Sequence, residues 1–210
     1  MDQTASDVAL LELRPFGRAL TLHRLPLCPE IQLWLLGEDV DLEAECRELH
    51  ELEATPYWAF CWGSGQALAR FLLDHPAEVR QRRVVDLGTG SGVVAIAAAK
   101  AGARSVLAID TDPEALAAVR VNAALNRVHV EVAERLPDAW DVVLASDILY
   151  ESEHRDWLLE LARGSPSVLV SDPERPSGPS LGMEPLTRIS VRTLPDVDSP
   201  MRAAAIFRLS

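Results

Sequence analysis

The sequence is poor in cysteine and has no long hydrophobic run. Its three cysteines, Cys28, Cys46 and Cys61, are widely spaced without a CxxC pair, and none of the five histidines stands in an HExxH spacing. Reduced, structural thiols are therefore expected, and no metal site is predicted. No apolar stretch approaches the length that crosses a bilayer, and the first twenty residues lack the basic start and apolar block of a secretory signal. We expect a soluble, cytoplasmic protein.

Basic residues are also scarce: 20 Lys and Arg stand against 32 Asp and Glu, which gives a formal charge of −12. Proteins that bind nucleic-acid backbones draw on clusters of basic side chains. The densest basic stretch, Arg80, Arg82 and Arg83, is short, so we predict no nucleic-acid partner. A basic or lysine-bearing protein suits this charge better. The length of 210 residues is enough for one domain with a small appendage.

From about residue 83 onward, apolar strands alternate with helices. Strands are expected at 83–87, 105–110, 128–132, 140–146 and 167–171, and helices at 91–101, 112–125 and 153–163. Near-continuous apolar strands in this rhythm indicate a mainly parallel sheet covered on both faces. After a loop rich in Pro, Gly and Ser, segments 187–194 and 201–209 resemble a terminal hairpin. The sequence therefore predicts an α/β fold with a doubly wound, seven-stranded, mainly parallel sheet.

The first 80 residues give a weaker pattern. Residues 20–25 are expected to form a strand, 30–36 a short helix or strand, and 42–52 an acidic helix. Residues 64–73 carry apolar side chains at helical spacing, and this helix is expected to stop near His75–Pro76. We predict that residues 1–80 form a cap packed on a core of residues 81–210.

The stretch VVDLGTGSG, residues 84–92, joins an apolar strand to a glycine-rich turn. Gly88, Gly90 and Gly92 let the backbone turn sharply and approach a ligand, because no Cβ stands in the way. Asp110 ends the next strand, where its carboxylate can accept hydrogen bonds from both hydroxyls of a ribose. In doubly wound sheets, ligands bind beyond the carboxyl ends of the strands. A tight turn and a solvated acid are the alternative, but together these features favour a nucleoside ligand.

The details of the loop distinguish between nucleoside ligands. A phosphate-cradling GK[S/T] sequence is absent, and the dinucleotide pattern fits poorly because its third small residue is replaced by Val93. The pattern G-x-G-x-G resembles motif I of class I S-adenosylmethionine-dependent methyltransferases. That resemblance implies a Rossmann-like sheet with an antiparallel final strand, and S-adenosyl-L-methionine as the cofactor.

A second motif, SDILY at residues 146–150, ends the fourth strand of the core. It lacks the prolines of the [N/D]PP[Y/F] motif and instead resembles the D-x-x-[Y/F] motif of the family 16 protein methyltransferases, most of which modify lysine. In that family's strand order, Asp147 faces the same cleft as the glycine loop. The resemblance implies that Asp147 orients the lysine amine and that Tyr150 lines the acceptor channel. Whether Asp147 acts as a formal base stays open.

The resemblance extends to segments 28–36, 56–76 and 171–176, in the order found in lysine methyltransferases of the electron transfer flavoprotein β subunit. Gly63 and Ser64 stand where that family commonly has Pro-Gly, and the acidic segment 38–53 is not recognisable. No long N-terminal extension of the mitochondrial kind is present, so we expect a bacterial cytoplasmic member. The implied reaction is lysine methylation of that β subunit. Another protein substrate, such as a ribosomal protein, and a small-molecule amine are the alternatives.

The resemblance also assigns the donor site. The residues expected to bind the cofactor are Trp62, Asp86, Gly88, Gly90, Gly92, Asp110, Glu134 and Asp147. Several further positions have two interpretations. Trp58 and Trp62 flank the site or belong to the core, Gln66 lies near the donor or caps its helix, and Glu134 contacts the adenine or is a solvated acid. Asp172 and Arg175 contact the substrate or form a turn. Asp112 is expected to be a helix N-cap, and His154 a surface residue.

Overall fold

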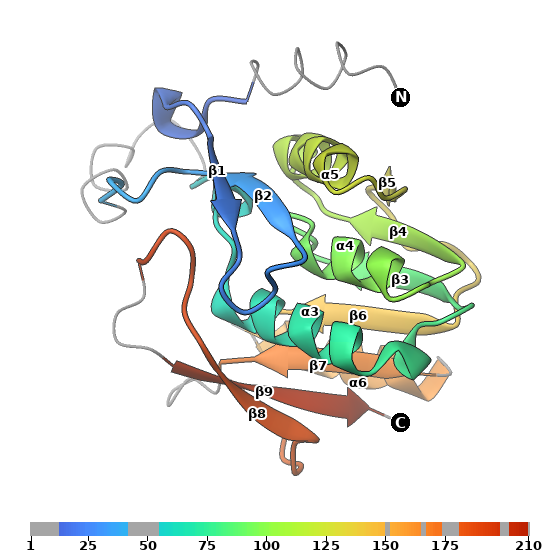
Figure 1. The fold of residues 1–210 in the computed structure, drawn as a ribbon. Helices are drawn as coiled ribbons and strands as arrows, with labels where there is room; N and C mark the ends of the chain where they lie inside the picture. The colour runs from blue at the N-terminus through green and yellow to red at the C-terminus, as the bar shows by residue number, and fades with distance from the viewer. Residues whose placement is uncertain are drawn as a thin grey trace.

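The computed structural model describes residues 13–41, 55–149, 152–164, 167–173, 181–197 and 202–209. Its centre is a seven-stranded sheet with the order β5-β4-β3-β6-β7-β9-β8 (Figure 1). The strands are β3 Arg83–Leu87, β4 Ser105–Ile109, β5 Glu131–Ala133, β6 Val142–Ser146, β7 Val168–Asp172, β8 Thr187–Val191 and β9 Arg202–Leu209. The first five pair in parallel, whereas β9 runs antiparallel to both β7 and β8. The predicted fold class and terminal hairpin are confirmed.

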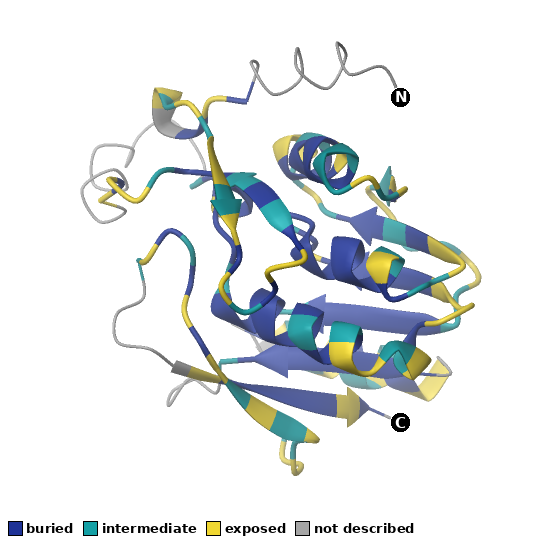
Figure 2. Cartoon of the chain, in the orientation of Figure 1, coloured by how far each residue is buried: buried dark blue, intermediate teal, exposed yellow. Residues whose placement is uncertain are grey.

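The central strands are apolar because both faces of the sheet are covered. Val84 and Val142 pack into a cluster with helices α3 (Gly63–Asp74) and α4 (Val93–Lys100). The next residues, Val85 and Val143, pack into a second cluster with Leu158 of α6 (Ser152–Gly164). Figure 1 shows α3 and α4 in front of the sheet and α6 behind it, and Figure 2 shows the central strands buried. The longer helices are α3 Gly63–Asp74, α4 Val93–Lys100, α5 Pro113–Leu125 and α6 Ser152–Gly164.

Several predicted boundaries were wrong by two or three residues; β6, for example, begins at Val142 and not at residue 140. Helix α4 begins at Val93 and not at residue 91, because Gly92 adopts a left-handed φ of 84° as the N-cap. Strand β5 begins at residue 131 because Val128 still belongs to the turn after α5, where its N–H donates to Ala123 O at 3.1 Å. Strand β8 ends before Leu194, which instead pairs with Cys61 in an isolated bridge.

The N-terminal region contains a small antiparallel hairpin of β1 Thr21–Arg24 and β2 Gln32–Leu35, so segment 30–36 forms a strand. The predicted helix 64–73 is confirmed as α3, which packs on the sheet beside α4. Short 3-10 helices are η1 Pro15–Gly17, η2 Tyr57–Ala59 and η3 Pro76–Glu78. The predicted acidic helix at 42–52 lies outside the described residues. A domain boundary at residue 80 stays a prediction.

Two asparagines, Asn122 of α5 and the C-cap residue Asn126, fasten this hairpin to the core. The side-chain amide of Asn126 pairs with the backbone of Gln32 as a neighbouring strand would. Its Oδ1 accepts from Gln32 N at 3.1 Å, and its Nδ2 donates to Gln32 O at 2.6 Å. Asn122, which is buried, accepts from Trp34 N at 2.8 Å and donates to Ser91 O in the glycine loop at 3.0 Å. The hairpin and the glycine loop are therefore connected through one side chain.

We expect Asn126→Ala to lower the free energy of unfolding by about 1–3 kcal/mol, because the substitution leaves a partly buried backbone N–H and C=O of Gln32 without their partners. Urea denaturation of the variant and the parent protein measures this difference. Lys100→Ala is a suitable control, since the exposed ammonium makes one long bond of 3.4 Å to Asn126 O. Equal loss in both variants would contradict the fastening role.

The cysteines in the described part of the chain behave as structural residues. Cys28 and Cys61 are free and buried, and burial raises the pKa of the Cys28 thiol to about 12. Burial likewise raises the pKa of Cys61. Cys46 lies outside the described residues. Within those same residues, no helix combines the length and hydrophobicity that a bilayer span requires.

Candidate active site

The glycine loop forms a tight turn at the carboxyl end of β3. Gly88 and Gly90 have φ values of +63° and +50°, a left-handed conformation that L side chains rarely adopt. A Cβ on Gly88 would stand 2.9 Å from Ile148 Cγ2, so the loop lies directly against the SDILY motif. Gly92, with φ +84°, packs instead against Val119 of α5, where a Cβ would meet Cγ2 at 3.1 Å. The predicted sharp turn is confirmed, and Gly92 has a packing reason of its own.

Asp110 lies beside this loop because β3 and β4 are parallel and in register, with Leu87 opposite Ile109. Its Oδ2 accepts from Gly90 N at 2.9 Å, and its Oδ1 accepts from Asp112 N at 3.1 Å. Each carboxylate oxygen has a further lone pair for another donor. Asp110 is half-buried, so it both braces the loop and remains able to accept from a ribose hydroxyl.

Asp86 lies beneath the loop and is almost fully buried. Its Oδ2 accepts from Thr89 Oγ1 at 2.7 Å and from Ala95 N at 3.2 Å, whereas its Oδ1 is buried without a hydrogen-bond partner. Burial raises the pKa of this carboxyl to about 7, and the hydrogen bonds from Thr89 and Ala95 oppose that shift. Asp86 thus supports the turn from below, between β3 and the start of α4.

The raised pKa of Asp86 makes the stability of the fold depend on pH. Between about pH 4 and pH 7 the native protein keeps a proton that the unfolded chain has lost, so stability falls as the pH rises. This effect amounts to about 1.4 kcal/mol per pH unit. We expect Asp86→Asn to flatten the decline by about 2 kcal/mol between pH 5 and pH 7, measured by urea denaturation. An equal loss of unfolding free energy between pH 5 and pH 7 in the variant and the parent would contradict the assignment of this pH dependence to Asp86.

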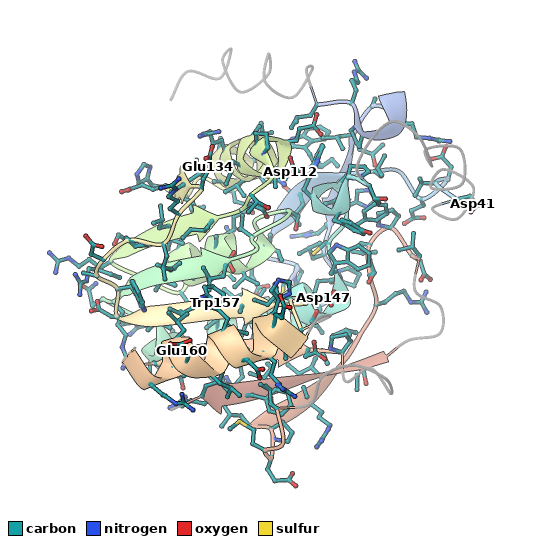
Figure 3. The ribbon with its side chains drawn as sticks, turned by 180° about the vertical axis from the view of Figure 1, so that it is seen from behind. Asp41, Asp112, Glu134, Asp147, Trp157 and Glu160 are labelled. Atoms are coloured by element: carbon teal, nitrogen blue, oxygen red, sulfur yellow. The ribbon has the colours of Figure 1, made fainter. Side chains whose placement is uncertain are left out.

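Asp147 follows β6, which pairs with β3 on the side opposite β4. The register places Ala145 opposite Leu87, so Asp147 and the glycine loop both leave the sheet at the same edge. Asp147 has a φ of +58°, and its N–H donates to Ser171 O at the end of β7 at 3.0 Å. Strained backbone of this kind is concentrated at functional sites. The predicted adjacency of Asp147 and the glycine loop is confirmed (Figure 3).

The segment before α3 closes over this edge. A Cβ on Gly90 would stand 3.9 Å from Trp58 Cα, and a Cβ on Gly65, in the first turn of α3, would stand 3.5 Å from Ser146 Oγ. Residues 57–65 therefore connect the glycine loop with the end of β6. Trp58 itself is buried and donates from Nε1 to Glu114 Oε2 at 3.2 Å, so its ring belongs to the core. Trp62, by contrast, is only half-buried at this rim.

The remaining predicted positions divide into three groups. Glu134 follows β5 and is exposed, while Asp172 is buried as the last residue of β7; both stand at the same sheet edge as Asp147. Gln66 donates to Arg192 O at 2.7 Å and to Cys61 O at 3.4 Å, so it ties α3 to the segment after β8. Tyr150 and Arg175 lie outside the described residues, and their roles stay predictions.

Asp112 and His154 were predicted to be away from the chemistry. Asp112 is the N-cap of α5, where its side chain accepts from Glu114 N at 2.8 Å, as expected. His154 is half-buried on α6 and not fully exposed. One residue was missed: Tyr57 is 61% exposed beside Trp62. The sequence PYWAFCW carries several aromatic residues, but it does not indicate which of them face solvent.

The residues at this edge fit S-adenosylmethionine. Among the described residues other than its two chain neighbours, none comes closer than 3.9 Å to the Cβ position of Gly90, which leaves room for a ligand to approach its backbone. Asp110 presents acceptor atoms beside it. The half-buried Asp147 adds a carboxylate next to the same loop. In the part of the chain that is described, no three His, Cys, Asp or Glu side chains gather closely enough to hold a metal ion.

Known proteins resemble this chain in sequence and in fold. A model of the ribosomal protein L11 methyltransferase family (PrmA) matches residues 64–152. The electron transfer flavoprotein β subunit lysine methyltransferase of Xenopus laevis is 42% identical over 161 residues, which cover 71% of this chain and 65% of that protein. The same enzyme of Rattus norvegicus is 38% identical over 184 residues, which cover 81% of this chain and 71% of that protein.

A solved structure, the magnesium protoporphyrin IX methyltransferase of Synechocystis PCC 6803 with bound S-adenosylmethionine, has the same fold. Its TM-score is 0.51 at 14% identity, and the alignment covers 83% of this chain and all of that one. The sheet order therefore defines a Rossmann-like fold. The relatives at 38–42% identity show that the chain is a methyltransferase. The chain belongs to the family of electron transfer flavoprotein β subunit lysine methyltransferases.

The chain spans 65% of the length of the Xenopus protein and 61% of the human one, which is less than two thirds of these relatives. The relatives with 38–42% identity come from vertebrates, and they give no support to the expected bacterial source.

Proposed function

We propose that this protein transfers a methyl group from S-adenosyl-L-methionine to a lysine side chain of the electron transfer flavoprotein β subunit. The observation that carries the proposal is the contact between the two motifs: the glycine loop and the SDILY segment meet at one sheet edge, with Asp110 and Asp147 on either side. The substrate follows from the relatives with 38–42% identity, which are lysine methyltransferases of that subunit. A cytoplasmic location and the absence of a nucleic-acid partner stay predictions.

Each part of the site has a chemical task. When bound, the donor supplies an electrophilic methyl on a positively charged sulfur, so the C–S bond breaks as the amine lone pair forms the new N–C bond. Asp110 and the Gly88–Gly90 turn hold the methyl donor. Asp147 accepts a hydrogen bond from the amine and aligns it in line with the breaking bond. A partly desolvated pocket lowers the pKa of the lysine amine and so favours the uncharged form that attacks the methyl. The product is a methylated ammonium, which gives a proton to solvent before it can accept another methyl group.

Labelled donor separates this substrate from its alternatives. The purified protein is incubated with isotopically labelled S-adenosylmethionine and, in parallel, with recombinant electron transfer flavoprotein, ribosomal protein L11 or small-molecule amines. The second protein is included because the L11 methyltransferase model matches residues 64–152. We expect label on the flavoprotein β subunit. Label on L11 alone would keep the reaction and reject the substrate, and label on small amines alone would reject protein methylation.

Self-labelling is easily recognised in this assay. The chain has a single lysine, Lys100, which is exposed at the end of α4 and donates to Asn126 O at 3.4 Å. A Lys100→Arg variant removes this lysine and keeps a positive charge. Label that persists on the β subunit with this variant comes from transfer between proteins.

A further inference from the structure

Three aromatic side chains gather where the segment before α3 crosses the site edge. The rings of Tyr57 and Trp62 have centroids 5.9 Å apart with a tilt of 48°, and those of Phe60 and Trp62 lie 5.6 Å apart with a tilt of 42°. Phe60 is fully buried, Trp62 is half-buried and Tyr57 is 61% exposed. We call Tyr57 and Trp62 the aromatic pair.

The aromatic pair is held rigidly. Trp62 Nε1 donates to Tyr57 O at 3.0 Å, which closes the short turn between the two residues. Cys61, directly before Trp62, exchanges two backbone hydrogen bonds with Leu194, at 2.7 and 2.9 Å. Phe60 anchors the turn from below in a buried cluster with Trp58. The exposed ring of Tyr57 and the half-buried ring of Trp62 therefore stand on a fixed backbone. This favours a binding role, because little order has to be gained when a ligand arrives.

The turn that carries the aromatic pair lies between the glycine loop and the end of β6. On one side, Trp58 Cα stands 3.9 Å from the Cβ position of Gly90 in the glycine loop. On the other side, the first turn of α3, which follows Trp62, reaches Ser146 Oγ, one residue before Asp147. The aromatic pair thus stands on the segment that connects the donor loop with the acceptor motif.

We propose that the aromatic pair binds the methylated ammonium of the substrate lysine and keeps that side chain at the site. The mono- or dimethylammonium then gives its proton to solvent, and the uncharged amine attacks the methyl of a fresh donor. The inference rests on the proposed function. Each added methyl replaces an N–H that Asp147 could hold, so the carboxylate loses hydrogen bonds as methylation proceeds. The faces of aromatic rings compensate for this loss, because they attract methylated ammonium groups without needing an N–H.

The test compares the products of three single variants at equal consumption of donor. Tyr57→Leu removes the ring and keeps the bulk of an apolar side chain, Tyr57→Phe keeps the ring, and Trp157→Leu removes an exposed aromatic on the outer face of α6 (Figure 3). We expect the wild type, Tyr57→Phe and Trp157→Leu to yield di- and trimethyl-lysine. Tyr57→Leu is expected to accumulate monomethyl-lysine, with the second and third steps slowed about threefold to tenfold relative to the first.

Intact-mass spectrometry of the methylated protein gives this distribution directly. An unchanged distribution in Tyr57→Leu would overturn the inference, and so would a wild type that stops at monomethyl-lysine. A structural role for Tyr57 would slow all steps equally and leave the distribution in place, which also contradicts the inference.

A binding measurement tests the aromatic pair without turnover. Protein saturated with S-adenosylhomocysteine is titrated with N-acetyl-trimethyllysine amide and with its neutral tert-butyl isostere. We expect the cation to bind about threefold to tenfold more tightly, and Tyr57→Leu to lose this preference. Equal affinities in the wild type would overturn the inference. Absence of any methyl transfer would instead reject the proposed function, while the binding preference still decides the role of the pair.

Discussion

Asp147→Asn is expected to lower kcat about 100-fold or more while donor affinity changes less than about threefold, because the carboxylate aligns the amine and the donor is held mainly from the other side. Asparagine is a suitable replacement, since it tolerates the φ of +58° found here and keeps the N–H bond to Ser171 O. The change therefore removes the charge and leaves the backbone in place. Steady-state kinetics and calorimetric donor binding measure the two quantities separately.

Asp112→Asn is the matched control. It makes the same change of charge nearby on the site edge, and asparagine caps a helix about as well as aspartate does. We expect kcat within about twofold of the parent for this control. A kcat for Asp147→Asn above about a third of the parent value would contradict the assignment of Asp147.

Gly90→Ala is expected to weaken donor binding about tenfold or more, because a methyl group there occupies the side from which a ligand reaches the loop. Apart from Gly90 and its two chain neighbours, the described residues place no atom closer than 3.9 Å to the Cβ position, so the described part of the fold has room for the methyl. The left-handed φ of +50° adds about 1–2 kcal/mol of strain, which lowers stability but does not explain a loss of binding.

Gly102→Ala separates strain from binding. Gly102 has a φ of +92°, with Arg80 Cγ 3.6 Å from its Cβ position, and it follows α4 at the opposite edge of the sheet. Both variants are expected to lose similar stability in urea denaturation, whereas calorimetry should show weakened donor binding in Gly90→Ala alone. Weakened binding in both variants, or in neither, would show that the open face of Gly90 does not hold the donor.

Much of the core was predictable because its signals are local. A buried parallel strand is a continuous apolar run, and the positions of Gly88 and Asp110 are set by the register of two such strands. The same reasoning placed Asp147 beside the loop, once β6 was expected next to β3. The errors concern element ends: the start of α4 depends on a left-handed glycine, and Leu194 pairs with Cys61 across 133 residues of sequence.

The N-terminal part was less predictable because its structure depends on distant partners. Within the segment 30–36, residues Gln32–Leu35 are a strand through their pairing with β1. The side-chain amides of Asn122 and of the C-cap residue Asn126 hold the edge of this strand. Exposure is likewise a tertiary property: Trp58 and Tyr57 are neighbours in the sequence, yet one is buried and the other is 61% exposed. No local pattern in PYWAFCW distinguishes these two rings.

The most direct test of this account is a peptide map of the electron transfer flavoprotein β subunit after incubation with the protein and S-adenosylmethionine. The account predicts methyl groups on lysine side chains when the parent protein is used, and their near absence when Asp147→Asn replaces it. Methylation at another residue type, or methyl-lysine formed equally well by the variant, would contradict the central role given to Asp147 and the glycine loop.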